Sequence, residues 1–193
     1  HSESYFRLCR IVKSQFEDFE PDGLQDWEKA QSSEKVNDAD QRLKDLNIQV
    51  QKFIFDRIKA EYGEEKDAYW EKGVLDKEIK TNAYKKAQDY DIDERLPLEN
   101  YLEFIEYKKI VENKIHWPLF KPIFDIQEPG MKGTSKNNKW MERINELRRI
   151  PAHATESRQY KLRDFEYIDY IYEEFMFRLN ADRESVRKEK EHT

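Results

Sequence analysis

The sequence is poor in the residues that form disulfides, tight turns and membrane spans. It has 1 cysteine, which excludes an internal disulfide and a multi-cysteine zinc site. Its 5 glycines and 6 prolines are few for a protein built of strands and turns. No apolar run approaches the roughly 20 residues that cross a bilayer. The opening residues "HSESYF" lack the basic and apolar parts of a leader peptide. We therefore expect a cytoplasmic protein with no membrane partner.

Charged and aromatic residues are abundant instead. Charged side chains make up 39% of the chain and hydrophobic ones 37%, which favours long solvated helices. Aromatic residues, at 13%, supply the large apolar surfaces that a disordered chain lacks. The composition predicts an all-α fold, a helical bundle with a long, hairpin-like helical N-terminal part. Because the chain begins with His1 rather than methionine, we expect a piece of a longer protein, fused to or partnered with another domain.

Apolar residues recur every three or four positions in several segments, which is the period of an amphipathic helix. The clearest segment runs from a Ser33 cap to Gly63 and carries a heptad seam of Val36, Ala39, Leu43, Leu46, Val50 and Phe53. Further helices are expected over 2–20, in shorter pieces within 64–93, and over 98–114, 139–150 and 160–179, with a short helix and a loop within 116–138. Aromatic and aliphatic residues at this spacing indicate core positions.

Proline and charge patterns suggest a division of the chain. Pro97 precedes a new helical pattern, so we place a boundary near residue 95. Residues 1–95 are expected to form a helical extension or connector, and residues 96–182 a helical bundle. Residues 183–193 are expected to form a frayed charged tail.

The charge is unevenly distributed along the chain. The whole sequence has a net charge of −6, but residues 130–163 hold nine lysines and arginines against three acids. A basic segment in an acidic protein indicates either a local rim for phosphate groups or an ordinary solvated loop. The candidate RNA-binding residues are Lys132, Lys136, Lys139, Arg158 and Lys161.

The stretch "INELRRIPAH" places two arginines, a proline and a histidine at the end of an expected helix. Pro151 cannot donate to the carbonyl of Leu147, so the helix must end or bend there. On an unbroken helix Arg148 and His153 would lie about 140° apart. They can serve one small site only if the chain bends between them or a second copy supplies the partner. Otherwise the arginines only compensate the helix dipole.

This stretch, together with "WPLFKPIF" (117–124) and with Trp140, which precedes "INELRRIPAH", resembles the HEPN superfamily of helical domains. Many members of that superfamily are metal-independent endoribonucleases. The resemblance covers about residues 95–180. It is nearest to the branch found at the C-terminus of a transcript-surveillance endoribonuclease and in prokaryotic conflict and phage-defence proteins. It implies a homodimer with a site shared by two copies.

The resemblance also implies residue roles. His153 would move protons, while Arg148 would hold the scissile phosphate and offset its growing charge, with Arg149 as helper. Asn145, one turn before Arg149, would orient either group. The RNA's own 2′-hydroxyl would attack, giving a 2′,3′-cyclic phosphate without metal or cofactor.

Two other interpretations stay open. Arg149 stands where active members often carry asparagine or another small polar residue, and the chain is acidic overall. Both observations favour a non-catalytic module for dimerisation or nucleic-acid sensing. In the third interpretation the motif is accidental and the chain is a plain helical bundle.

The remaining candidates carry less chemistry. His116, before Trp117, is expected to make local hydrogen bonds, and Trp117 and Trp140 to lie in the core rather than stack on bases. No histidines or carboxylates show metal-ligand spacing, so no metal is expected. Cys9 lies on the apolar side of its helix and is expected to be inert.

Overall fold

A computed structural model describes residues 2–16, 19, 21–128, 137–150 and 159–191. The fold is all-α, as predicted, and the described residues contain no strand. They form two compact units, His1–Gln41 and Arg42–Thr193, and helix α2 runs through the boundary. In the described part of the chain, every helix is too short or too polar to cross a membrane.

The first unit contains α1 (Ser2–Lys13) and the beginning of α2 (Leu24–Tyr62). Helix α1 ends earlier than the expected 2–20 segment, and the Ser14 hydroxyl donates to the carbonyl of Ile11 at 2.6 Å. Cys9 is buried, as expected, and Phe6 stacks on Trp27 with ring centroids 5.8 Å apart. Tyr5 and Leu8 were expected to face inward but are exposed, because α1 packs through its Phe6 and Cys9 side. Phe16, beyond the end of α1, is exposed as well.

Helix α2 begins at Leu24, well before the predicted start at Ser33, and ends at Gly63 as predicted. The heptad seam is confirmed from Ala39 onward, since Leu43, Leu46, Val50 and Phe53 are buried. Val36 is half-buried. Gly63 has φ +80°, a left-handed conformation that glycine adopts without strain.

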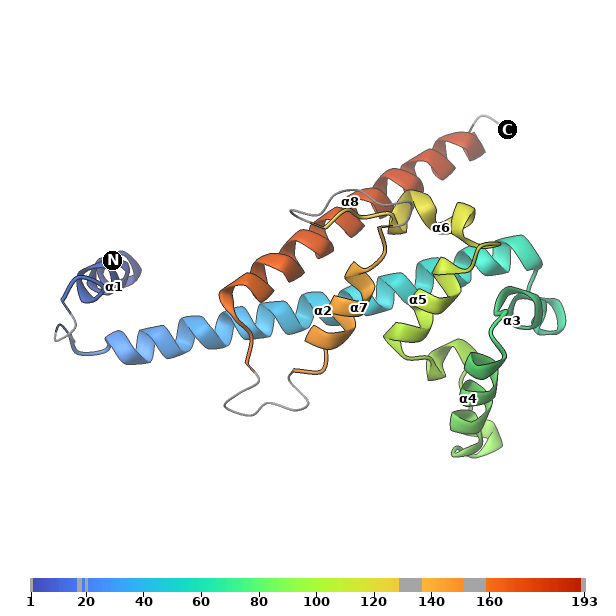
Figure 1. The fold of residues 1–193 in the computed structure, drawn as a ribbon, viewed down its shortest axis with the longest axis horizontal. Helices are drawn as coiled ribbons and strands as arrows, with labels where there is room; N and C mark the ends of the chain where they lie inside the picture. The colour runs from blue at the N-terminus through green and yellow to red at the C-terminus, as the bar shows by residue number, and fades with distance from the viewer. Residues whose placement is uncertain (1, 17–18, 20, 129–136, 151–158, 192–193) are drawn as a thin grey trace. The chain divides into compact units, whose positions relative to one another are not determined.

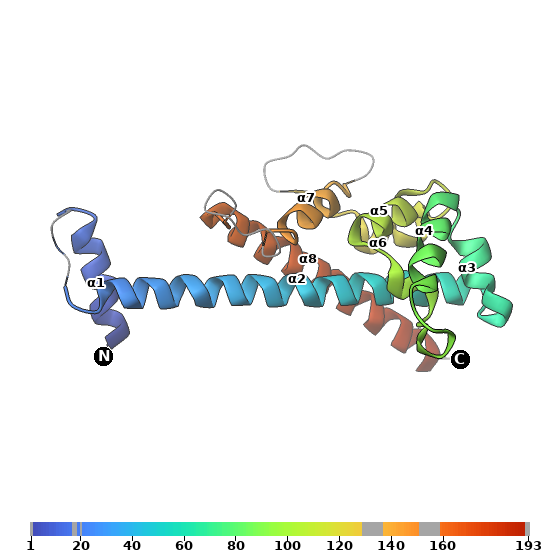
Figure 2. The same cartoon turned by 90° about the horizontal axis from the view of Figure 1, so that it is seen from below.

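The second unit packs short helices against α2. After α2 come helices α3 (Ala68–Gly73), α4 (Lys77–Gln88), α5 (Phe104–Glu112), α6 (Trp117–Phe124), α7 (Trp140–Leu147) and α8 (Leu162–Glu191). Three 3₁₀ turns, Glu65–Asp67, Ile92–Glu94 and Leu98–Tyr101, lie between α2 and α5. Figures 1 and 2 show α8 crossing α2, with α5, α6 and α7 gathered beside the crossing and α3 and α4 near the end of α2.

A cluster of aromatic rings forms the centre of the second unit. Phe124 lies 6.1 Å from Trp140 and 5.6 Å from Phe175, measured between ring centroids. Phe53 of α2 and Phe104 of α5 extend the cluster at 6.0 Å from Phe124 and 6.5 Å from Trp140. The rings come from five helices, α2, α5, α6, α7 and α8. Trp140 is fully buried, so its core position is confirmed.

The two compact units divide at Gln41 and Arg42, inside α2, and not near residue 95. Contacts cross the expected boundary: Lys59 Nζ lies 2.9 Å from a carboxylate oxygen of the buried Glu99, and Gln51 donates to the Glu99 carbonyl at 3.0 Å. Residues 42–95 therefore pack together with the following helices in one unit.

The expected frayed tail is helical in the structure, because α8 continues to Glu191. Arginine, lysine and glutamate form helices readily, and their mixed signs allow favourable neighbours along the helix. Two contacts also tie this part to α2, since Arg57 pairs with Asp182 and Arg183 donates to Gln49 at 3.0 Å.

Gly73 gives a test of the packing between α3 and α2. A Cβ added there would lie 2.1 Å from Ile58 Cγ2. We expect Gly73→Ala to lower the free energy of unfolding by about 1–3 kcal/mol, the usual cost of overpacking. Urea unfolding measures this. Gly63→Asn is the matched control, because a Cβ there meets nothing within 4 Å and asparagine tolerates positive φ. Equal losses in the two variants would contradict the close approach.

Candidate functional site

Helix α7 positions the arginines that the sequence singles out. Trp140 donates from Nε1 to the carbonyl of Phe124 at 3.1 Å, and Ile144 and Leu147 are buried as predicted. The buried side fixes how α7 is rotated about its axis, because every third or fourth residue must face the core. After Leu147 the chain forms a turn in which the Arg148 N–H donates to the carbonyl of Ile144 at 3.0 Å.

Arg148 lies half-buried against α5. Its Cζ is 5.0 Å from the centre of the Phe104 ring, which places the guanidinium over the face of the ring. Burial lowers the pKa of Arg148, while the neighbouring Tyr107 and Glu103 raise it. The group stays cationic at any physiological pH. Among the described residues no carboxylate lies within ion-pair distance of it, so the charge is partly desolvated and available to an anion.

Arg149 and Asn145 are less constrained. Arg149 Nη2 lies 3.9 Å from Glu103 Oε2, and both side chains are more than half exposed. A pair of this kind contributes little, about 0–1 kcal/mol. Asn145 is half-buried one turn earlier on α7. The turn thus presents one held guanidinium, Arg148, and one solvated guanidinium, Arg149.

The structure places only part of the predicted site. Lys139 and Lys161 are exposed at the starts of α7 and α8. Four predicted residues lie outside the described residues: His153, Lys132, Lys136 and Arg158. Tyr160, which follows the 151–158 segment, contacts the end of α7, which precedes it: the Tyr160 hydroxyl donates to the carbonyl of Leu147 at 3.4 Å.

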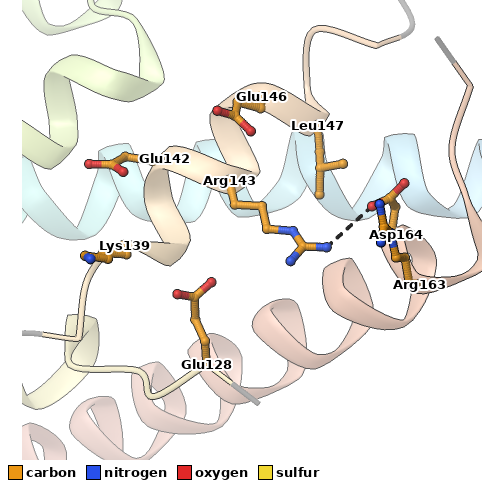
Figure 3. A pocket seen from close by; sticks show the side chains of 8 residues that line it. All are labelled: Glu128, Lys139, Glu142, Arg143, Glu146, Leu147, Arg163 and Asp164. Atoms are coloured by element: carbon orange, nitrogen blue, oxygen red, sulfur yellow. Dashed lines mark hydrogen bonds and ion pairs between the residues drawn. The ribbon is translucent and has the colours of Figure 1, made fainter. Parts of the chain in front are cut away.

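A groove of about 580 Å³ lies between α7 and the beginning of α8 (Figure 3). Its lining includes three cations and four acids: Lys139, Arg143, Arg163, Glu128, Glu142, Glu146 and Asp164. Figure 3 shows Arg143 reaching from α7 toward Asp164 of α8, with the Glu128 side chain below Arg143 in this view. The Arg143–Asp164 distance is 3.5 Å. The groove adjoins Leu147, the last residue of α7.

The ring of the buried Tyr167 packs against the guanidinium of Arg143. The Arg143 Cζ lies 4.0 Å from the centre of the Tyr167 ring, a close cation–π contact. The Tyr167 hydroxyl donates to Glu128, and burial together with that carboxylate raises the pKa of Tyr167 well above its ordinary range. Tyr167 therefore stays neutral and keeps donating to Glu128. Neither contact can be read from the sequence, because residue spacing does not say which side chains of α8 meet α7.

His116 lies apart from the arginines. His116 is 2% exposed, and its Nε2 lies 3.2 Å from the hydroxyl of Tyr62 on α2, so this hydrogen bond joins distant parts of the chain and is not the local one that was expected. Nδ1 is buried without a hydrogen-bond partner among the described residues. A neighbouring pocket of about 210 Å³ is lined in part by Asp76 and Lys109. Trp117 is buried as expected.

Comparison with known proteins identifies no relative: no family model, curated protein or solved structure matches the chain. Within the described ranges, no three His, Cys, Asp or Glu side chains gather as a metal ion would require.

The buried His116 predicts how stability depends on pH. Burial lowers the pKa of His116 in the folded state, outweighing the smaller opposite effects of the Ile110 backbone and of Glu61. The unfolded chain therefore takes up the proton first as pH falls, so the free energy of unfolding should decrease below about pH 6.5. Urea unfolding between pH 7.5 and about pH 5 measures this decrease. In His116→Gln the decrease should be smaller, whereas His192→Gln should keep it. An unchanged slope in His116→Gln would contradict the prediction.

Proposed function

We propose that this chain is a HEPN-type, metal-independent endoribonuclease module that acts as a homodimer within a larger defence or stress-response protein. The proposal rests on the resemblance of residues 95–180 and on one structural observation. Arg148 is held over Phe104 at the end of α7, partly buried and without a described carboxylate partner, directly before the segment that carries His153.

The proposed chemistry is transfer of a phosphoryl group within the RNA. The 2′-hydroxyl oxygen attacks the adjacent phosphorus, the bond to the 5′-oxygen breaks, and a 2′,3′-cyclic phosphate and a 5′-hydroxyl result. His153, whose type titrates near neutral pH, takes the proton from the attacking hydroxyl or gives one to the leaving oxygen. In a dimer each copy supplies one histidine.

Arg148 has the properties that this chemistry needs from a cation. Negative charge grows on the non-bridging phosphate oxygens in the transition state, and a fixed guanidinium offsets it without having to reorganise. Partial burial strengthens the attraction, because less water screens the charge. Arg149, which is solvated and only weakly paired with Glu103, supplies a second donor group in this scheme, and Asn145 orients one of the two arginines.

The charges around α7 favour a second candidate function, a non-catalytic dimerisation or nucleic-acid-sensing module. Four acids line the groove beside α7, and Glu103 lies near both arginines of the turn. Carboxylates near a phosphate site oppose binding of a polyanion. In this alternative Arg148 mainly stabilises α5 against α7.

Catalysis is tested with labelled RNA in EDTA, using the full chain. We expect cyclic-phosphate ends from the wild type, a rate lower by about 10²–10⁴-fold in His153→Ala, and one lower by about 10²-fold or more in Arg148→Met. Methionine keeps apolar contact with Phe104, and Arg95→Met is the matched control for loss of an exposed arginine elsewhere in the unit. Cleavage that is equal in the wild type and in His153→Ala would exclude the proposed mechanism.

Sedimentation tests the dimer separately. Both the catalytic and the non-catalytic module are expected to be dimeric at micromolar concentrations, since the resemblance implies a site shared by two copies. A strictly monomeric chain at about 100 μM would count against both. A dimer without cleavage would favour the second candidate.

A further inference from the structure

One carboxylate lies among cations that come from two different helices. Oε2 of Glu103 is 3.9 Å from Nη2 of Arg149, and Oε1 of the same group is 3.2 Å from Nζ of Lys86 on α4. We propose that Lys86, Arg148 and Arg149 form one binding site for an RNA phosphate. In the free protein Glu103 occupies the place of that phosphate. That the ligand is RNA rests on the proposed function, whereas the contacts of Glu103 show that cations meet at one anion.

Arg148 belongs to this cluster through its contact with α5. Its Cζ lies 5.0 Å from the ring centre of Phe104, the residue directly after Glu103. Burial lowers the pKa of Arg148, whereas Tyr107 and the Glu103 carboxylate raise it. The carboxylate is therefore close enough for its charge to act on Arg148 as well as on Arg149.

The charge of this cluster is positive. Three cations and one carboxylate give a net charge of +2, and Glu103 is the only described carboxylate within ion-pair distance of Lys86 or Arg149. Four acids follow α4 in the sequence, and all of them are exposed: Asp89, Asp91, Asp93 and Glu94. In the described part of the chain none of the four pairs with Lys86 or Arg149, so water and salt screen their charges.

Lys86 and Arg149 keep donors for a phosphate. The Lys86 ammonium has three N–H groups, of which one donates to the Tyr101 carbonyl at 3.1 Å and one to Glu103. The Arg149 guanidinium has five, and its 3.9 Å contact with Glu103 is longer than a hydrogen bond. A phosphate also presents paired oxygens, so it can replace this contact with shorter, charge-assisted hydrogen bonds.

Releasing Glu103 from Arg149 costs little, because both side chains are more than half exposed and such a pair adds little stability. Glu103 cannot move far, however. It is the N-cap residue of α5, its backbone N–H donates to Glu106 at 2.7 Å, and its other carboxylate oxygen contacts Lys86. The carboxylate thus stays near a bound phosphate and repels it, which lowers the affinity for RNA.

Lys86 lies outside residues 95–180, the range of the resemblance, and no spacing rule links it to Arg149. The two side chains meet through Glu103 because residues 42–95 pack in one unit with the later helices. A phosphate ligand on α4 is therefore a feature of this packing, in a segment that the sequence marks only as a connector.

RNA binding by the full chain tests the proposal. A labelled single-stranded RNA is titrated at low salt in EDTA, with His153→Ala in every protein so that binding is measured without cleavage. We expect Glu103→Gln to lower the Kd about two- to fivefold, because it removes the competing charge and keeps the shape. Lys86→Gln is expected to raise the Kd by a similar factor, and Lys86→Arg, which keeps the charge, to restore most of the binding.

Matched controls separate these effects from a change in net charge or in folding. Lys85→Gln removes the exposed neighbour of Lys86, and Glu94→Gln removes an exposed acid after α4. Each should change the Kd less than the variant that it matches. Circular dichroism and urea unfolding check the fold. If Glu103→Gln unfolds, Glu103→Ser takes its place, since serine is a favoured N-cap residue without charge.

The outcomes distinguish this site from the proposed ribonuclease activity. The expected changes in Kd together with a wild type that does not cleave RNA would support the site and exclude the catalytic proposal. A wild type that cleaves, with Kd values unchanged by both Lys86→Gln and Glu103→Gln, would overturn the site alone. Absence of RNA binding at about 100 μM protein would also overturn it.

Discussion

The burial of Trp140 between α6 and α8 is the constraint on which the candidate sites depend. Its indole contacts the rings of Phe104, Phe124 and Phe175, and its N–H donates to the Phe124 carbonyl. Removing an aromatic side chain of this size from a core costs about 3–5 kcal/mol. The orientation of α7 about its axis is therefore fixed strongly, and so are the directions of its charged side chains.

That orientation sends two arginines of one short segment to different neighbours. Arg143 and Arg148 are five residues apart, about 140° around a helix, and Arg148 lies in the turn that closes α7. Arg143 contacts Tyr167 of α8 and Arg148 contacts Phe104 of α5. Both guanidinium groups rest on an aromatic ring and keep unused donors.

The charged surface also contributes to the fold. Tyr172 donates to Asp45 at 2.7 Å and Arg42 lies 3.3 Å from Asp169, which ties α8 to α2. Each exposed pair adds little alone. Beyond Leu179, the last buried residue among those described, Asp182 and Arg183 still contact Arg57 and Gln49 of α2. Polar contacts between α2 and α8 therefore lengthen the contact between the two helices beyond the aromatic cluster.

The sequence by itself determined the helical class, the main apolar faces and the end of α2. These features follow from local rules: the 3.6-residue period, the scarcity of breakers and the freedom of glycine at positive φ. It also marked Arg148 as a candidate, through spacing and resemblance. Only the tertiary structure decided that Arg148 is partly buried on Phe104, that residues 42–95 pack with the later helices, and that Arg143 lies against Tyr167. The reason is physical: helical period says which residues share a face, but the partner of that face is chosen by packing among helices far apart in the chain.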